Sequence, residues 1–294
     1  MRSTTSKGEF CVHFTKLEAL GNDFILIDGN EARSVSNLGA LAVRMCRRTA
    51  GAGADGILVL GPPESTDADV AMRIWNADGS EAEVSGNGTR CVAAYLDARG
   101  RWPIEQPELK VSTVAGVKRL SRAGASTYEM YMGQPSLRCG DVPFTGLSAG
   151  ERGIDVPLTA CGRDWTATVS SIGNPHCSIF VEDPEDMDWR TAGAAIERHP
   201  AFPNRVNVEF IRVVARDVLD VRFWERGVGE TQSSGTGSAA ATVAAIATGR
   251  TDRRVTVRTP AGELSVAWPD DDASVVLVGP ARSVYRGEWL LPTD

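Results

Sequence analysis

Two serines, each followed by a Gly-x-Gly turn, are the residues whose type and spacing could carry chemistry in this chain. Ser85 opens the segment SGNG, and Ser234 opens the segment SGTG. Glycine lets a ligand approach the backbone closely, and the free N–H groups and dipole of a following helix favour an anion such as a carboxylate. No GK[ST] motif follows either turn, so we do not expect a phosphate-binding nucleotide loop.

Each serine also has a purely structural interpretation, as the N-cap residue of a helix. The surrounding sequence favours a functional one, because Arg73–Gly88 (RIWNADGSEAEVSGNG) returns without a gap as Arg222–Gly237 (RFWERGVGETQSSGTG). Such a duplicated strand–loop–helix unit predicts a site between two halves, with one reactive group from each half.

The elements that must position the two turns are duplicated as well. LGNDFILID at Leu20–Asp28 resembles IGNPHCSIF at Ile172–Phe180. Asp55 and Asn207 each precede an apolar run that predicts a strand, and we align these two residues as equivalent positions. The repeat therefore extends well beyond the glycine turns.

In each half, the hydrophobic pattern predicts two strands, a helix, two more strands, a helix at the glycine turn and two closing strands. The strands expected are 12–15, 24–27, 57–60, 69–75, 108–114 and 128–132, then 167–172, 178–181, 206–213, 220–224, 255–259 and 275–278. The helices expected are 35–46, 88–99, 189–198 and 237–248, with Gly100 and Gly249 ending the two that follow the turns.

This pattern indicates an α+β fold of two pseudo-symmetric domains that arose by internal duplication. Each domain would be a curved, mostly antiparallel sheet around a central helix, with the active-site cleft between the domains. We expect residues 1–133 plus 281–294 to form the N-terminal domain and residues 134–280 the C-terminal domain. In this scheme residues 281–294 contribute a strand that packs back on the first half.

Charge and hydropathy exclude two classes of partner. A formal net charge of −7 over 294 residues, with no basic run, argues against nucleic-acid binding. The N-terminus MRSTTSKGEF lacks the apolar core of a signal peptide, and no stretch approaches the roughly 18 apolar residues of a membrane span. We expect a cytoplasmic protein without a membrane partner.

The metal-binding and cofactor-binding residue types predict a site with neither a metal nor an organic cofactor. The six cysteines form no CxxC pair, and we expect reduced thiols. The three histidines are too scattered along the sequence to indicate a metal site. No lysine lies beside the glycine turns, which argues against a pyridoxal phosphate Schiff base.

Taken together, the motifs resemble the diaminopimelate epimerase family from Leu20 to Glu288. The matching segments are GNDF at Gly21, GADG at Gly53, NADGSEAE at Asn76, GNGTRC at Gly86, GNPH at Gly173, the strand at Asn207, ERGVGET at Glu225 and GTG at Gly235. The resemblance implies two pseudo-symmetric α+β domains with a cleft between them, and it is compatible with a homodimer.

The activity that this resemblance implies is the cofactor-independent inversion of one stereocentre of LL-diaminopimelate. The product is the meso form, a precursor of lysine and peptidoglycan. Inverting an α-carbon requires a base on one face and an acid on the other. In the family these two groups are cysteines that stand directly before the Gly-x-Gly turns, where a helix N-terminus lowers the pKa of a thiol.

The resemblance also assigns the residues that surround the reacting carbon. The substrate-binding residues would be Asn22, Asn76, Gly86, Asn87, Asn174, Asn207, Glu225, Arg226, Gly235 and Thr236. Arg226 suits bidentate binding of a carboxylate, and Glu225 suits an amino group. His176 and Glu225 would also tune the acid/base pair.

At both acid/base positions this chain departs from the family, because Ser85 and Ser234 stand where the family has cysteine. A hydroxyl is a much weaker acid than a thiol, and a helix terminus alone does not produce an alkoxide at neutral pH. Cys91 lies too far along the following helix to replace a missing thiol, and Cys177 is the thiol we consider as a stand-in. Gly56 also lacks an amide side chain that some members carry.

Three hypotheses therefore remain open. The first is a diaminopimelate epimerase-type isomerase with Ser85 and Ser234 as the catalytic pair. The second is a related isomerase or dehydratase that acts on another amino acid. The third is a catalytically silent protein that binds an amino acid.

Overall fold

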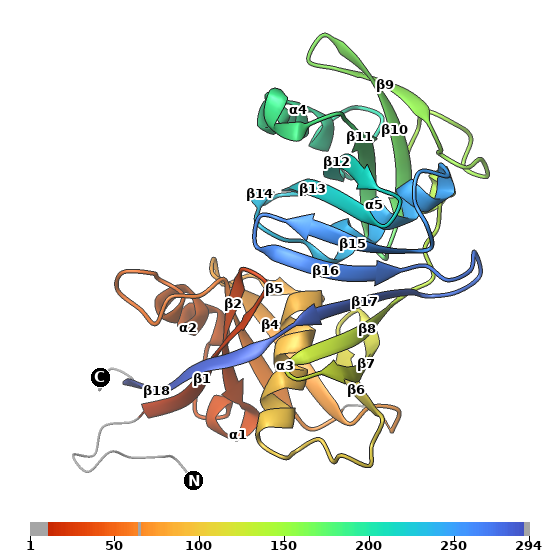
Figure 1. The fold of residues 1–294 in the computed structure, drawn as a ribbon. Helices are drawn as coiled ribbons and strands as arrows, with labels where there is room; N and C mark the ends of the chain where they lie inside the picture. Colours follow the sequence, from red (N-terminus) through yellow and green to blue (C-terminus); the bar gives the residue numbers. More distant parts are fainter. Residues whose placement is uncertain (1–10, 64–65, 291–294) are drawn as a thin grey trace. The chain divides into compact units, whose positions relative to one another are not determined.

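The duplication inferred from the sequence reappears in the order in which the strands pair. The computed structural model describes residues 11–63 and 66–290. The chain divides into two compact units: the first runs to Met130 and resumes at Gly279, and the second spans Tyr131–Val278 (Figure 1). These boundaries lie within a few residues of the domain boundaries expected from the sequence.

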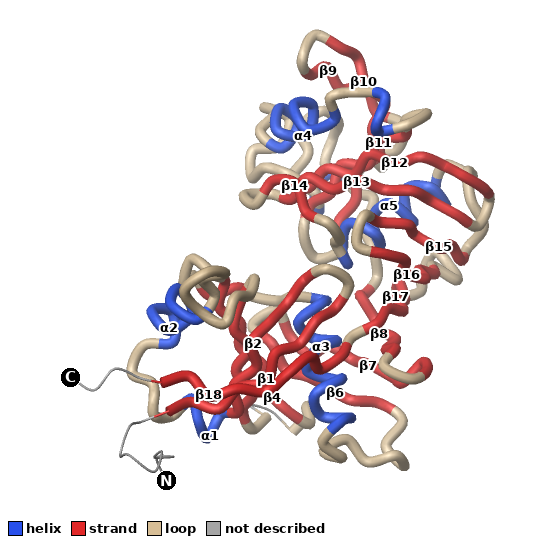
Figure 2. Tube along the Cα trace, turned by 60° about the vertical axis from the view of Figure 1, so that its left-hand side comes forward, coloured by secondary structure: helices blue, strands red, loops and turns tan. Residues whose placement is uncertain are grey.

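The first unit is a mixed sheet that draws strands from both ends of the chain. Its strands, in sheet order, are β18 (Arg282–Leu290), β1 (Cys11–Ala19), β2 (Asn22–Asp28), β3 (Gly56–Gly61), β4 (Val70–Asn76), β6 (Glu108–Thr113) and β7 (Gly116–Gly124). The pairs β2–β3 and β4–β6 are parallel, and the others are antiparallel. Figure 2 shows β18 beside β1, so residues 282–290 return to the first unit as predicted.

The second unit repeats this order. Its strands, in sheet order, are β9 (Val156–Ala160), β10 (Arg163–Ser171), β11 (Pro175–Phe180), β12 (Asn207–Ala215), β13 (Val218–Glu225), β15 (Arg254–Thr259), β16 (Gly262–Ala267) and β17 (Val275–Pro280). Again two pairs, β11–β12 and β13–β15, are parallel. β9 thus takes the place in this unit that β18 takes in the first.

Short hairpin strands follow β4 and β13 in the two units. β5 (Glu81–Ala82) pairs with β4, and β14 (Gly229–Thr231) pairs with β13. β8 (Thr127–Gly133) contains the position at which the chain leaves the first unit. Each hairpin strand brings the chain back to the start of the helix that a glycine turn opens.

A helix covers each face of the sheet in each unit. α3 (Gly86–Ala98) packs against β1 to β4, and α5 (Gly235–Ala247) packs against β10 to β13. On the other face lie α2 (Leu38–Met45) and α4 (Trp189–Glu197). The short helices are α1 (Gly29–Ala32) and the 3₁₀ turns η1 (Cys139–Asp141) and η2 (Pro184–Asp186).

The side chains of β3 show why the two helices lie on opposite faces. Ile57 belongs to the buried cluster that contains Leu41 and Met45 of α2. The neighbouring Leu58 lies against Gly88 of α3. Because successive side chains of a strand point to opposite faces, α2 and α3 enclose the sheet between them.

The helices at the glycine turns begin two residues earlier and end one residue earlier than predicted. α3 and α5 begin at Gly86 and Gly235, so the first glycine of each turn is already helical. Gly100 and Gly249 follow the C-caps with φ of 64° and 70°. This left-handed conformation is the one that favours glycine after a helix.

The sequence prediction missed five strands and misplaced one helix start. The missed strands are β5, β7, β9, β14 and β16. β5 and β14 are only 2 and 3 residues long, and β7 is mostly exposed. β9 alternates between buried and exposed residues, but it contains Pro157, which disfavours a strand. The helix expected from Val35 begins at Leu38, since the side chain of Asn37 accepts a hydrogen bond from the Ala40 N–H and caps it there.

The alignment of Asp55 with Asn207 is also wrong, by one residue. Ile57 pairs with Trp75, and Val208 pairs with Trp224. Since the two tryptophans are equivalent in the repeat, Ile57 matches Val208, and Gly56 matches Asn207. The alignment relied on the chemical similarity of Asp55 and Asn207, whereas the pairing of the strands determines which positions are equivalent.

The cysteines behave as the sequence predicted. Cys46, Cys91, Cys139 and Cys177 are buried free thiols, and Cys161 is an exposed one. Within residues 11–63 and 66–290, no helix is long and apolar enough to cross a membrane.

Candidate active site

Ser85 and Ser234 occupy the same local structure in the two units. Both are N-cap residues with extended backbone, at φ and ψ of −139° and 122° for Ser85 and −138° and 124° for Ser234. The Ser85 Oγ accepts the Gly88 N–H at 3.0 Å, and the Ser234 Oγ accepts the Gly237 N–H at 3.1 Å. A backbone donor and the positive end of a helix therefore face each hydroxyl oxygen.

The two glycines of each turn serve different purposes. A Cβ on Gly88 would lie 3.1 Å from Leu58, and one on Gly237 would lie 2.8 Å from Phe223. These second glycines allow the helix to pack on its strand. A Cβ on Gly86 or Gly235 would meet nothing closer than 3.9 or 3.8 Å, respectively, so packing does not require a glycine there. The absence of a side chain at this first glycine leaves space at the first turn of the helix, where a ligand can approach the backbone.

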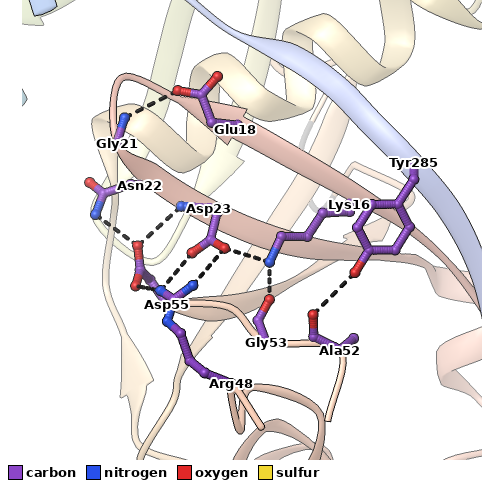
Figure 3. Close-up of polar contacts among 10 residues, drawn as sticks. All are labelled: Lys16, Glu18, Gly21, Asn22, Asp23, Arg48, Ala52, Gly53, Asp55 and Tyr285. Atoms are coloured by element: carbon purple, nitrogen blue, oxygen red, sulfur yellow. Dashed lines mark hydrogen bonds and ion pairs between the residues drawn. The ribbon is translucent and has the colours of Figure 1, made fainter. Parts of the chain in front are cut away.

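In the first unit, a row of polar side chains leads to the Ser85 turn. The Asn22 Nδ2 donates to the Asp55 Oδ2 at 3.0 Å, and the Asn22 Oδ1 accepts from the Asn87 Nδ2. Asn87 is the second residue after Ser85. Figure 3 shows Asn22, the first residue of β2, beside Asp55. The structure therefore brings the predicted residues Asn22, Asn87 and Ser85 together.

Asn76 ends β4 in the same unit and is exposed. Its Nδ2 donates to the Ser80 Oγ at 3.0 Å, and its backbone N–H donates to the Ser80 carbonyl. Its side-chain oxygen accepts no hydrogen bond from the described residues. We therefore keep Asn76 as a predicted ligand residue of the first unit. The predicted site residues of one unit are called a half-site below.

The second unit places Asn174 as the first places Asn22. The Asn174 Nδ2 lies 3.4 Å from the Oγ1 of Thr236, the second residue after Ser234. The Asn174 Oδ1 lies 2.9 Å from the His176 Nε2. The amide contact with the glycine turn is thus common to both units, but its other partner is a carboxylate in one unit and an imidazole in the other.

His176 is held by Glu209, a residue that sequence analysis missed. The His176 Nδ1 lies 2.6 Å from the Glu209 Oε1, and the Ser178 hydroxyl donates to the Glu209 Oε2 at 3.2 Å. All three side chains are buried. Burial raises the pKa of Glu209, and the contacts with His176 and Ser178 oppose this shift. No local sequence pattern reveals this contact, because it depends on the parallel pairing that sets Ser178 beside Glu209 on β11 and β12.

Glu225 provides a carboxyl group beside Ser234. The Thr231 hydroxyl donates to the Glu225 Oε1 at 2.6 Å. Burial raises the pKa of Glu225, while hydrogen bonds from Thr231 and Ser234 and the nearby His176 lower it in part. The equivalent residue in the first unit is Asn76, so Ser85 has no such carboxyl group at the matching position.

Asn207 positions the backbone next to Glu225. Its Nδ2 donates to the Pro175 carbonyl at 2.8 Å, and its Oδ1 accepts the Arg226 N–H at 2.9 Å. This bridge uses both ends of the amide and ties β11 to the end of β13. Arg226 itself is exposed, and its Nη1 makes one long contact of 3.3 Å with the Asn204 carbonyl. The guanidinium thus keeps donors for a ligand.

The cysteines do not replace the missing thiols. Cys177, the suggested stand-in, is buried between the sheet and α4, and burial raises its pKa. Cys91 is also buried, with a raised pKa for the same reason. A neutral, inaccessible thiol is a poor base. The suggestion of Cys177 is therefore wrong.

Outside these half-sites, Cys11, His13 and Glu288 place one metal-ligating atom each within 4.8 Å of one another. The sequence separation concealed this group, because β18 pairs with β1 and sets Glu288 opposite His13. The two imidazole nitrogens face Glu31 at 3.4 Å and Glu288 at 3.3 Å. His13 therefore lies between the carboxylates of Glu31 on α1 and Glu288 on β18.

The class of protein is defined by the fold. A hydroxyproline epimerase from Agrobacterium vitis superposes with a TM-score of 0.68 at 14% identity, covering 99% of this chain and 94% of that chain. A methylitaconate-delta-isomerase superposes with a TM-score of 0.66 at 15% identity, covering 96% and 95% of the two chains. The chain therefore has the duplicated α+β fold of these isomerases.

Sequence comparison gives the family. A model of the diaminopimelate epimerase family matches residues 14–138 and 168–284. The diaminopimelate epimerase of Pelotomaculum thermopropionicum is 45% identical over 283 residues, covering 95% of this chain and 99% of that protein. That of Moorella thermoacetica is 43% identical over 284 residues, covering 95% and 100%. The chain belongs to the diaminopimelate epimerase family.

Proposed function

We propose that this protein is a diaminopimelate epimerase, which interconverts LL- and meso-diaminopimelate by two-base proton transfer without a cofactor. Family membership supports this proposal. The observation that carries it is the pair of equivalent helix starts, in which a hydroxyl at Ser85 or Ser234 stands before an open glycine. Inversion needs one proton acceptor and one proton donor, and each unit supplies one hydroxyl.

The second unit is equipped to move the proton of Ser234. The hydroxyl donates toward Glu225, whose pKa burial raises, so this carboxyl group binds a proton more readily than an exposed glutamate. The Gly237 N–H points at the same hydroxyl oxygen. A proton can therefore pass from Ser234 to Glu225 while the helix start stabilises charge on the oxygen.

Ser85 is the weaker base of the two serines, because its unit supplies no carboxyl group at the position that matches Glu225. Its oxygen accepts the Gly88 N–H, but Asn76 stands where the second unit has Glu225. An amide cannot take up the serine proton. When Ser85 donates its proton to the α-carbon it becomes an alkoxide, which the Gly88 N–H and the α3 start stabilise and which solvent water re-protonates. We propose that this step, which has no carboxyl partner, limits turnover.

The polar groups around the serines suit the charges of an amino acid. Arg226 retains free donors for a carboxylate, and the backbone N–H groups at Gly86 and Gly235 offer two further anion sites. Negative charge develops on the substrate carboxylate when the α-proton leaves, so donors placed there lower the barrier. Glu225 offers an acceptor for the ammonium group.

Proton exchange at the α-carbon is the direct test. The purified protein is incubated in D₂O with LL-diaminopimelate and no added cofactor, and deuterium incorporation and the meso product are followed by NMR. Incorporation together with the meso product is the expected result. The absence of both would contradict the proposal for this chain.

The serines favour a second candidate, namely an amino-acid-binding protein without turnover. The double variant Ser85→Cys with Ser234→Cys separates the two, because thiols restore the acid strength that hydroxyls lack. A large gain in exchange in that variant, with tight binding but no exchange in the parent chain, would favour the silent binder. Exchange in the parent chain would favour the epimerase, and exchange with a product other than the meso isomer would indicate a related isomerase or dehydratase. We also propose that the protein is cytoplasmic, as expected from the sequence.

A further inference from the structure

The polar row that ends at the Ser85 turn has a fixed direction. The Asn22 amide donates to Asp55 and accepts from Asn87. The Asn87 Oδ1 in turn accepts from the Arg90 Nη2 at 2.6 Å. A carboxylate only accepts hydrogen bonds, and a guanidinium only donates them. The two ends of the row therefore decide which way both amides point.

Asp55 is held in place by an ionic cluster, which Figure 3 shows at the start of β2 and β3. The Arg48 Nη2 lies 2.5 Å from the Asp55 Oδ1, and the same guanidinium binds both oxygens of Asp23 at 2.9 Å. The Lys16 ammonium lies 2.5 Å from the Asp23 carboxylate. The backbone N–H of Asp23 donates to the Asp55 Oδ2, the oxygen that binds Asn22. Asp55 thus has little freedom to turn away.

Arg90, at the other end of the row, is a buried cation with few polar partners. It is 0% exposed, and its Nε and Nη1 have no hydrogen-bond partner in the described part of the chain. Among the same residues, no carboxylate forms an ion pair with it. Burial lowers the pKa of Arg90 to about 10, so the side chain remains charged at neutral pH. A buried charge without an ion-pair partner lowers the stability of the fold. Its presence here therefore indicates a role other than stability.

We propose that Asp55 and Arg90 are positioning residues that orient Asn22 and Asn87 so that both amides direct N–H groups toward a substrate carboxylate at the Ser85 turn. This inference rests on the function proposed above. Each amide nitrogen has two hydrogens and uses one within the row, so each keeps one for a ligand. The Asn87 oxygen accepts the hydrogen bond from Arg90, and the positive charge of Arg90 adds to that of the α3 start.

The second unit lacks this device. Thr236 and Ala239 stand where the first unit has Asn87 and Arg90, and Asn174 faces His176 rather than a carboxylate. The pair of oriented amides is therefore a carboxylate-binding feature of the first unit. The second unit, with Glu225 and Arg226, carries both an acceptor for ammonium and a donor for carboxylate.

The test uses three single variants of the full chain, one double variant that combines Arg90→Met with Asp55→Asn, and one control. Arg90→Met removes the cation at similar length, Arg90→Lys keeps a charged donor, and Asp55→Asn removes the fixed acceptor. Val92→Ala, at a fully buried residue of the same helix, is the control for a loss of packing. Dissociation constants for LL-diaminopimelate are measured by calorimetry, and melting temperatures are recorded for each protein.

Arg90→Met and Asp55→Asn are each expected to weaken binding about ten-fold or more, since each loses a hydrogen bond to a charged group. The double variant should bind no worse than about the weaker single variant, because both act on the same amides. Arg90→Lys should recover most of the affinity, and Val92→Ala should lower the melting temperature without changing affinity. Equal affinities in all proteins, or losses that follow the melting temperature alone, would overturn the proposal.

A second measurement tests the orientation without a substrate. In protein labelled with ¹⁵N-asparagine, the side-chain signals of Asn22 and Asn87 should shift or broaden in Arg90→Met and Asp55→Asn, and should stay unchanged in Val92→Ala. Unchanged signals in the first two variants would overturn the orienting role. If the parent chain bound no diaminopimelate while these signals responded as expected, the proposed function would fail and the orienting role would stand.

Discussion

The Nδ1 of His176 lies 2.6 Å from the Oε1 of Glu209, and neither side chain is exposed by more than 1%. The other ring nitrogen contacts Asn174, which also reaches Thr236 in the Ser234 turn. A buried carboxylate therefore determines how an imidazole faces a residue predicted to bind the substrate. In this arrangement Glu209 acts on the site through His176.

Glu209→Gln should weaken substrate binding while the protein remains folded. Glutamine keeps the shape but replaces a charge-assisted hydrogen bond to His176 with a neutral one, and the expected loss is about ten-fold in affinity. Calorimetry with LL-diaminopimelate measures it. Ser178→Ala is the matched control, because it removes the other partner of Glu209 and leaves the contact with His176 intact. Equal losses in both variants would assign Glu209 a purely structural role.

Glu225→Gln should stabilise the protein at neutral pH and abolish exchange of the α-proton. Burial raises the pKa of Glu225 above its ordinary value of 4.5. A group whose pKa is raised in the folded state contributes stability that is fully present below pH 4.5 and is lost as the pH rises through the folded-state value. Glutamine removes this loss, so the gain in stability should be seen above pH 4.5 and not below it.

Chemical denaturation as a function of pH measures this difference. Glu230→Gln is the control, because Glu230 lies on the same hairpin, exposed and paired with Arg190. That variant should keep exchange activity and show no such gain above pH 4.5. A Glu225→Gln protein less stable than the parent at neutral pH would contradict the raised pKa.

The two glycines of the first turn should respond differently to alanine. Gly88→Ala should destabilise the protein by about 1 to 3 kcal/mol, because its Cβ would press on Leu58 and Ser85. Gly86→Ala should leave stability equal or raise it by up to about 1 kcal/mol, since the position is helical and open. It should nevertheless weaken substrate binding, because a methyl group would then stand where the ligand approaches.

Thermal unfolding and calorimetry on the two variants decide between these effects. The pair Gly235→Ala and Gly237→Ala repeats the experiment in the second unit, where Phe223 replaces Leu58 as the obstacle. If Gly86→Ala bound the substrate as tightly as the parent chain, the open space at that glycine would have no role in binding.

Local sequence features predicted the parts of the site that depend on one short segment. The serine caps, the glycine turns and the helix ends follow from residue types at fixed spacing. Glu209 was missed because it acts only through the parallel pairing of β11 with β12, which no local pattern reveals. Arg90 was included in a family motif, but its burial and its contact with Asn87 depend on how α3 packs. The alignment of Asp55 with Asn207 failed for a related reason, since chemical similarity was used where strand register decides.

Asp23→Asn should destabilise the protein most at neutral pH and least in acid. Burial opposes the charge of Asp23, but hydrogen bonds from Arg48 and Lys16 prevail and lower its pKa below 3.8. A group with a lowered pKa contributes stability that is present above its unfolded-state pKa and is lost as the pH falls through the folded-state value. The parent chain and the variant should therefore converge in stability below about pH 3.8.

The expected loss at neutral pH is about 3 kcal/mol, because the variant leaves the buried ammonium of Lys16 without its carboxylate. Glu263→Gln is the control: it breaks the exposed ion pair with Arg258 and should cost at most about 1 kcal/mol at any pH. Unfolding free energies from pH 2 to 7 test both expectations. A loss in Asp23→Asn that stays constant down to pH 2 would show that packing, and not the charge of Asp23, stabilises the start of β2.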